Sequence, residues 1–215
     1  MTDSVTEPAA LRGDSRRAAL DERNVDADPF RQFARWFDEA GAAGIRDPNA
    51  MVLASAGPGG QPSARVVLLK GVDARGFVFY TNYASRKARE LAPDAPAALL
   101  FFWPGLERQI RIEGIVERVG GPESDAYFAT RPRESQLGAW ASPQSSPIPD
   151  RGWLDTSYAE CAARFDGRVP RPPHWGGIRV LPSRFEFWQG RASRLHDRLV
   201  WTRTDGGWTL GRLAP

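Results

Sequence analysis

Short apolar runs of the length typical of β-strands fill the chain from residue 50 onward, and turn residues separate them. A few helical patterns interrupt the runs, but the sequence has no strand–helix–strand rhythm and no Gly-x-Gly-x-x-Gly fingerprint. This pattern favours antiparallel strands joined by hairpins over a parallel nucleotide-binding sheet. The sequence therefore predicts a mainly β fold with helices, built as a closed or partly closed antiparallel barrel.

The helices are predicted from apolar residues at helical spacing, and the strands from short apolar or alternating runs. Asp28 and Pro29 supply an N-cap and a first-turn proline, and Phe33 and Trp36 then recur at helical spacing. Further helices are expected at 85–91, 123–130 and 154–165. Strands are expected at 51–56, 64–70, 77–81, 97–103, 109–119, 177–180, 184–189 and 199–204, with a last hairpin turning at 205–207.

The first 27 residues contain almost no large apolar side chains, which predicts a flexible N-terminal arm before a single domain over residues 28–215. No run of about 18 apolar residues and no hydrophobic signal segment occurs, so we expect a cytoplasmic protein without a membrane partner. Cys161 is the only cysteine and the chain has two histidines, so no metal site is expected. Acidic and basic residues are interleaved, which argues against a nucleic-acid partner.

The 29 basic residues include only two lysines, Lys70 and Lys87. Arg65 and Lys70 are five residues apart on an expected strand, so their side chains should point to opposite faces and serve two anionic groups. Ser85, Arg86 and Lys87 stand at the expected start of a helix, which could cradle a phosphate. They also suit an ordinary solvated surface with a serine cap.

Two later segments are rich in polar side chains. Arg131–Trp140 and Ser142–Ser146 carry more hydrogen-bonding groups than a loop needs, which fits either a second anion site or self-satisfied turns. Arg194, His196 and Arg198 would share one face if extended and follow Trp188, so they could line a flat heteroaromatic ligand. A single histidine of this kind is more often structural.

Taken in order, these motifs closely resemble those of the pyridoxamine 5′-phosphate oxidase family over roughly residues 28–215. The motifs are Arg65-Val-Val-Leu-Leu-Lys70, Tyr80-Thr-Asn82, Ser85-Arg-Lys-Ala88, Arg108-Gln109, Arg131-Pro-Arg-Glu-Ser-Gln-Leu-Gly-Ala-Trp140, Trp175-Gly-Gly177, Glu186-Phe-Trp-Gln-Gly190 and Arg194-Leu-His-Asp-Arg198. The resemblance implies a homodimeric, FMN-binding split β-barrel. It also implies oxidation of pyridoxamine 5′-phosphate and pyridoxine 5′-phosphate to pyridoxal 5′-phosphate, with O2 as acceptor and hydrogen peroxide as by-product.

The resemblance also implies roles for individual residues. The FMN contacts would be Arg65, Val66, Val67, Leu68, Leu69, Lys70, Tyr80, Thr81, Arg86, Lys87, Gln109, Gln144, Ser145, Trp188 and Arg198. Substrate would be held by Lys70, Tyr127, Arg131, Ser135, Arg194, Leu195 and His196, with Arg194 and His196 beside the reacting carbon. Relatives carry a Leu-Arg-x-x-Tyr stretch that can fold over the substrate, whereas Leu11-Arg-Gly-Asp-Ser15 ends here in serine, which leaves this lid role open.

Two other classes of function compete with this interpretation. One is a split-barrel flavin reductase, or a related flavin oxidase acting on another ring, which should keep the FMN motifs and lose the substrate motifs. The other is an anion- or nucleic-acid-binding module without catalysis, which rests only on a pI near 9.4. Both the FMN set and the substrate set are present, which favours the oxidase.

Overall fold

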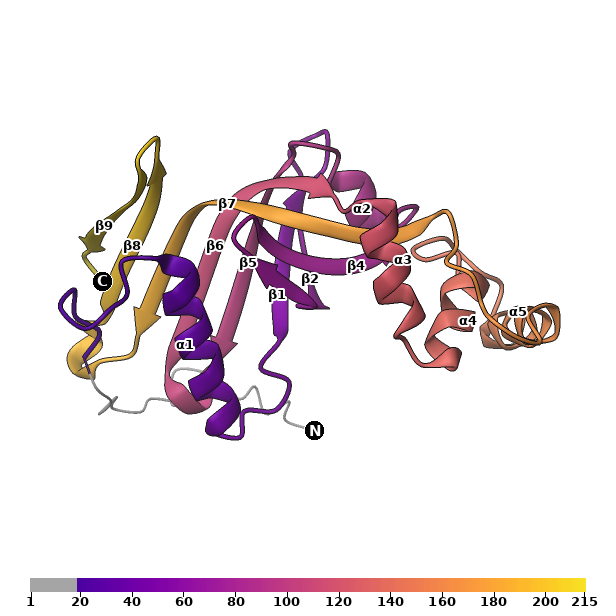
Figure 1. The fold of residues 1–215 in the computed structure, drawn as a ribbon, viewed down its shortest axis with the longest axis horizontal. Coiled ribbons are helices and arrows are strands. Elements are labelled where there is room, and N and C mark those ends of the chain that lie inside the picture. The colour runs from indigo at the N-terminus through magenta and orange to yellow at the C-terminus, as the bar shows by residue number, and fades with distance from the viewer. Residues whose placement is uncertain (1–18) are drawn as a thin grey trace, which may run out of the picture. The chain divides into compact units, whose positions relative to one another are not determined.

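The computed structural model describes residues 19–215, and Figure 1 shows their helices and strands. The strands are β1 (Ala50–Ala56), β2 (Pro62–Leu68), β3 (Gly71–Asp73), β4 (Gly76–Asn82), β5 (Pro96–Trp103), β6 (Arg108–Arg118), β7 (Trp175–Gln189), β8 (Asp197–Thr204) and β9 (Gly207–Leu213). The α-helices are α1 (Pro29–Ala42), α2 (Arg86–Glu90), α3 (Gly121–Ala129), α4 (Arg133–Ala141) and α5 (Arg151–Arg164). Short 3-10 turns are η2 (Pro104–Leu106) and η3 (Ala192–Arg194).

The described chain divides into two compact units. The first contains residues up to Arg46, Phe102–Ile110 and Glu186–Pro215, and the second contains Asp47–Phe101 and Arg111–Phe185. The strand order is β2-β1-β5-β6-β7-β4-β3, and β8 pairs with both β7 and β9. The pairs β1–β2, β1–β5, β3–β4, β4–β7 and β8–β9 are antiparallel, so the predicted mainly β, antiparallel fold with helices is confirmed.

The core of the second unit forms where alternate residues of its strands point inward. β1 alternates buried and accessible positions, and Met51 and Leu53 are its buried members. Phe77 of β4 lies 5.8 Å from Phe185, measured between ring centres, and both rings are completely buried. Burial of such aromatic rings dominates the energetics of a core this size. This core fixes β4, from which Tyr80 and Thr81 project.

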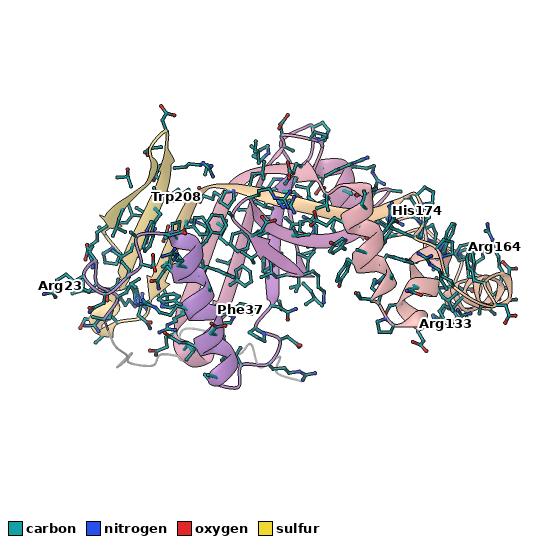
Figure 2. All side chains as sticks on the ribbon, in the orientation of Figure 1. Arg23, Phe37, Arg133, Arg164, His174 and Trp208 are labelled. Atoms are coloured by element: carbon teal, nitrogen blue, oxygen red, sulfur yellow. The ribbon has the colours of Figure 1, made fainter. Side chains whose placement is uncertain are left out.

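The core of the first unit forms around α1. The Asp28 side chain accepts a hydrogen bond from the Phe30 N–H at 2.9 Å and caps the helix, as the sequence predicts. Trp36 meets Phe187 edge-on at 5.2 Å between ring centres, and Phe187 meets Trp201 of β8 at 5.1 Å. Phe37, labelled in Figure 2, stacks on Phe33 of the same helix.

The last residues of the expected arm make defined contacts in the first unit. The Leu20 side chain is buried, its N–H donates to Asp197 and its carbonyl accepts from Arg212. Glu22 forms an ion pair with Arg212 at 2.7 Å. The expectation of a flexible arm therefore does not hold for residues 20–22, because one buried leucine and an arginine fork anchor them. The Leu11–Ser15 stretch lies outside the described residues.

Replacing Leu20 with alanine is expected to lower the free energy of unfolding by about 2 kcal/mol, the low end for a buried Leu→Ala change. The reason is that Leu20 is 5% exposed and sits where two hydrogen bonds already hold its backbone. Urea unfolding would measure the change, with Asn24→Ala, an exposed neighbour, as the control. Equal stability of the two variants would contradict this anchor.

Two elements differ from the sequence expectation. The segment Arg131–Trp140 was expected as a polar loop, but α4 occupies most of it because Leu137 and Ala141 form a buried i, i+4 pair among good helix formers. The expected strands 177–180 and 184–189 form the single strand β7, which continues through Pro182. It can do so because Gly114 faces that point: a Cβ there would lie 2.0 Å from the Leu181 carbonyl oxygen.

Candidate active site

A pocket of about 520 Å³ opens in the second unit beside β2 and β4. Its walls come from β2, the β2–β3 connection, β4, α2, the α3–α4 region, the loop after α4 and the start of β7. The lining residues are Val66, Val67, Leu68, Lys70, Tyr80, Thr81, Asn82, Lys87, Tyr127, Thr130, Arg131, Pro132, Ser135, Gln144 and Trp175. All four residues of the predicted phosphate set for the substrate, Lys70, Tyr127, Arg131 and Ser135, are among them.

Arg131 carries the clearest sign of an anion-binding site. Its guanidinium carbon lies 4.7 Å from the centre of the Trp175 ring, a cation–π arrangement that fixes its position. Its NH1 nitrogen is buried and has no hydrogen-bond partner among the described residues. Burial lowers the pKa of Arg131, yet an arginine stays charged in a protein. A buried charged donor without an acceptor is costly, and an anionic ligand would satisfy it.

Lys70 adds a second cation at this pocket. β2 ends at Leu68, so Lys70 lies beyond the strand, and its backbone N–H donates to the Val78 carbonyl at 2.8 Å. The opposite-face argument from strand alternation therefore does not apply to it. Arg65 nevertheless is not part of the pocket lining and Lys70 is. No ion pair joins Lys70 to a carboxylate in the described part of the chain.

Three aromatic rings form a nearly parallel stack along one wall. Tyr80 and Tyr127 lie 3.9 Å apart between ring centres at 14°, and Tyr80 and Trp175 lie 5.3 Å apart at 10°. Gly177 makes room for this stack, since a Cβ there would lie 3.0 Å from the Tyr80 ring. Trp175 belongs to one of the sequence motifs, but no role at the site was predicted for it. The only local signal for such a role is an aromatic residue followed by two glycines.

Lys87 faces the pocket with three neutral oxygens around it. Its ammonium donates to Gln144 Oε1 at 2.7 Å, to Thr81 Oγ1 at 3.2 Å and more weakly to Ser85 Oγ at 3.5 Å. Burial lowers the pKa of Lys87, and the nearby charge of Arg65 lowers it further. No described carboxylate pairs with it. The structure thus brings the predicted residues Thr81, Lys87 and Gln144 together.

Glu90 was not predicted, and it organises the remaining predicted phosphate ligands. Its carboxylate accepts from the hydroxyls of Ser55 and Ser63 and from the guanidinium groups of Arg65, at 3.0 Å, and Arg86, at 2.8 Å. These four donors lower the pKa of Glu90 to about 2, with the Ser63 hydrogen bond the largest cause. The only sequence signal was the i, i+4 spacing of Arg86 and Glu90.

This lowered pKa predicts a loss of stability in acid. Glu90 titrates near 2 in the folded chain and near its ordinary value of 4.5 when unfolded, so its contribution is complete above pH 4.5 and disappears as pH falls toward 2. We expect the wild type to lose about 1.5–3 kcal/mol more between pH 5 and pH 2 than Glu90→Gln. Urea unfolding at a series of pH values would measure the free energy of unfolding of the wild type and of Glu90→Gln. An equal decrease in both between pH 5 and pH 2 would contradict the prediction.

A further group of the predicted site residues belongs to the first unit. His196 packs on Trp188 at 4.6 Å between ring centres, and its Nδ1 accepts from the Arg191 N–H at 3.1 Å. Arg198 donates to Glu186 at 2.8 Å, which raises the pKa of Arg198. The Leu195 side chain is exposed, and Gln109 is half-buried on β6.

The expectation that Arg194, His196 and Arg198 share one face of an extended segment is wrong. Ser193 and Arg194 have positive φ values of 58° and 60°, and residues 192–194 form a 3-10 turn. β8 begins only at Asp197, so Arg194 precedes the strand that carries Arg198. Strand alternation thus cannot relate these three side chains.

Four predicted cofactor residues of the second unit do not line the pocket. Leu69 is buried, and its N–H donates to the Asn49 carbonyl at 2.8 Å. Ser145 has a positive φ of 70° in the exposed loop after α4. Arg65 and Arg86 instead bind Glu90. The predicted helix at 85–91 is the single turn α2, and the Ser85 side chain makes no capping hydrogen bond, so a helix-terminus contribution to anion binding is small here.

No helix among residues 19–215 combines the length and the apolar character needed to cross a membrane. Within the same residues, no group of three or more His, Cys, Asp or Glu side chains is arranged to hold a metal ion.

A cationic pocket with a stacked aromatic wall, set on a mainly β antiparallel fold, is suited to a flat anionic ligand. The family model described as pyridoxamine 5′-phosphate oxidase matches residues 37–165. A second model, the C-terminal dimerisation region of pyridoxine 5′-phosphate oxidase, matches residues 175–215. The chain belongs to the pyridoxine/pyridoxamine 5′-phosphate oxidase family and is an oxidoreductase of that family. The matched dimerisation region indicates a homodimer.

Individual relatives agree with the family models. A pyridoxine/pyridoxamine 5′-phosphate oxidase of Ralstonia pickettii is 60% identical over 212 residues, covering 98% of this chain and 100% of the relative. One from Rubrobacter xylanophilus is 61% identical over 208 residues, covering 96% of each chain. The solved structure of PhzG from Burkholderia lata, in complex with tetrahydrophenazine-1-carboxylic acid, is 34% identical with a TM-score of 0.85, covering 90% of this chain and 95% of PhzG. The predicted split β-barrel fold class and family are confirmed.

Proposed function

We propose that this chain binds FMN and oxidises pyridoxamine 5′-phosphate and pyridoxine 5′-phosphate to pyridoxal 5′-phosphate, with O2 as acceptor and hydrogen peroxide as by-product. The observation that carries the proposal is the buried, unpaired NH1 of Arg131 in a pocket that also contains Lys70. Two cations that pair with no carboxylate in the described part of the chain suit the dianionic phosphate of such a substrate. A substrate lacking the phosphate would leave the Arg131 donor unsatisfied.

The residues present also fit FMN. Within residues 19–215, Lys87 contacts only neutral oxygens, so its charge is available to a phosphate. Arg86 is largely exposed, and only its Nε is occupied among the described residues, by Glu90. Thr81 and Gln144 offer neutral hydrogen-bonding groups beside Lys87. By the family resemblance, Gln109, Trp188 and Arg198 of the first unit would contact other parts of FMN.

Bound FMN would supply the two-electron acceptor that takes a hydride from substrate C4′ and returns both electrons to O2. The chain's own residues would bind and orient. Lys70, Arg131 and Ser135 would hold the substrate phosphate, and the Tyr127 ring would limit movement of the substrate on its aromatic wall. Arg194 and His196 would border C4′, where the amine or alcohol loses a proton. Much of the rate would then come from proximity and orientation.

Steady-state assays can test this function directly. Purified protein supplied with FMN should form pyridoxal 5′-phosphate and hydrogen peroxide in equal amounts from pyridoxamine 5′-phosphate and from pyridoxine 5′-phosphate. Pyridoxamine without its phosphate serves as the matched control and should react with a far lower kcat/KM. Equal rates with and without the phosphate would contradict the assignment of Lys70 and Arg131.

A related oxidase activity on another ring is the second candidate, because the PhzG structure with its tetrahydrophenazine ligand shares this fold at 34% identity. A tetrahydrophenazine carboxylate carries no phosphate, so it does not account for Lys70 and Arg131 together. Oxidation of such a compound, with no turnover of pyridoxamine 5′-phosphate, would favour this candidate over the one proposed.

A further inference from the structure

The Glu90 carboxylate joins two arginines that come from different elements of the second unit. Arg65 lies on β2 and Arg86 begins α2, and Glu90 ends the same helical turn. Oε2 of Glu90 accepts from Arg65, and Oε1 accepts from Nε of Arg86. The Glu90 side chain is 8% exposed, so water screens these contacts little. One carboxylate thus holds two like-charged groups near each other.

Arg65 uses almost all of its donors inside the protein. Its NH1 contacts the Leu53 carbonyl at 3.2 Å and the Ser55 hydroxyl at 2.6 Å, and its NH2 contacts the Ser63 hydroxyl and Glu90. A guanidinium has five N–H donors, so these contacts leave only Nε–H without a strong acceptor. Glu90 and these neighbouring oxygens therefore fix the position of Arg65, and Nε–H is the donor that this arrangement leaves for a ligand.

Arg86, unlike Arg65, uses only one of its nitrogens as a donor within the described part of the chain. Its Nε binds Glu90, whereas its two terminal nitrogens have no acceptor among the described residues. The side chain is 61% exposed, so those nitrogens are accessible to a ligand. A guanidinium anchored at Nε keeps its terminal edge in a fixed direction, which suits two parallel hydrogen bonds to a phosphate. Lys87, the next residue, adds its ammonium beside Gln144.

We propose that Glu90 is the positioning residue of the FMN phosphate site: it holds Arg65 in place and fixes Arg86 so that its terminal edge faces the phosphate. This inference rests on the proposed binding of FMN. It places Glu90 behind the predicted phosphate ligands Arg65, Arg86 and Lys87, and makes the terminal edge of Arg86 the group whose direction Glu90 sets. Glu90 itself does not touch the flavin phosphate, since two negative groups would repel each other.

Binding of FMN and of riboflavin to flavin-free protein separates this role from a general structural one, because riboflavin lacks the phosphate. Glu90→Gln keeps the size of the side chain but presents an amide N–H to one of the two arginines. We expect it to weaken FMN binding by about tenfold or more and to leave riboflavin binding unchanged. The control is Asp155→Asn, which breaks an exposed i, i+4 ion pair with Arg151. It should change neither the dissociation constant of FMN nor that of riboflavin.

Arg86→Lys provides a second variant, because Arg86 is too exposed for its replacement to affect folding. It keeps the charge but loses the anchored fork, and we expect a loss of FMN affinity similar to that of Glu90→Gln. Unchanged FMN affinity in Arg86→Lys, or equal losses for FMN and riboflavin in Glu90→Gln, would overturn the positioning role. If the wild type itself bound riboflavin as tightly as FMN, the proposed phosphate site would fail instead.

Discussion

Alanine at position 87 is expected to weaken FMN binding by roughly 10- to 100-fold, because a hydrogen bond to a charged group contributes about 1.5–3 kcal/mol. Lys87 is a half-buried cation of the pocket, and its partners among residues 19–215 are all neutral oxygens, so its removal takes away a charge that no described carboxylate neutralises. Quenching of flavin fluorescence on titration with flavin-free protein measures the dissociation constant of FMN. Riboflavin affinity should change much less.

Arg89→Ala is the matched control for Lys87→Ala. Arg89 belongs to the same helical turn, is exposed, and donates to the Ala84 carbonyl rather than into the pocket. We expect its FMN affinity to equal that of the wild type. A Lys87→Ala variant that retains full FMN affinity would show that Lys87 does not contact the flavin phosphate.

Arg131→Ala is expected to raise the KM for pyridoxamine 5′-phosphate by roughly 10- to 100-fold while the absorption spectrum of bound flavin stays the same. The mutation removes a charged donor that the Trp175 ring holds in place and that lacks a partner in the described protein. Because the phosphate contact is the same in ground and transition states, kcat should change little. Steady-state kinetics with both phosphorylated substrates would measure the change.

Arg133→Ala controls for the loss of a nearby arginine. Arg133, labelled in Figure 2, stands two positions later at the start of α4. Its guanidinium donates to the carbonyls of Phe165 and Gly167, outside the pocket. Its KM should remain at the wild-type value. Loss of bound flavin in Arg131→Ala, with an unchanged KM, would place Arg131 in the cofactor site and contradict the division between the two anions.

Local signals sufficed for much of the fold. The Asp28 cap and the helical spacing of Phe33 and Trp36 predict α1, and the Asp205-Gly206-Gly207 turn predicts the β8–β9 hairpin. Local signals failed where a distant partner decides the structure. Pro182 reads as a strand break, yet β7 continues because Gly114, far away in sequence, leaves room for it.

The candidate site shows the same difference between residues that local motifs predict and residues whose role depends on distant partners. Lys70, Tyr127, Arg131 and Ser135 were predicted from the order of motifs along the chain, and all four line one pocket. Glu90 was missed because its partners Ser55 and Ser63 are 35 and 27 residues away, so no spacing rule connects them. The geometry of Arg194 was misjudged because its positive φ, uncommon for a residue with a Cβ, is invisible to strand alternation.

Anaerobic mixing of the FMN-loaded protein with pyridoxamine 5′-phosphate tests the central claim most directly, because it isolates transfer of electrons from substrate to flavin. We predict that the visible absorption bands of the flavin bleach, that one pyridoxal 5′-phosphate forms per flavin, and that admission of O2 restores the bands with release of hydrogen peroxide. Flavin bands that persist with saturating substrate in the absence of oxygen would contradict the account.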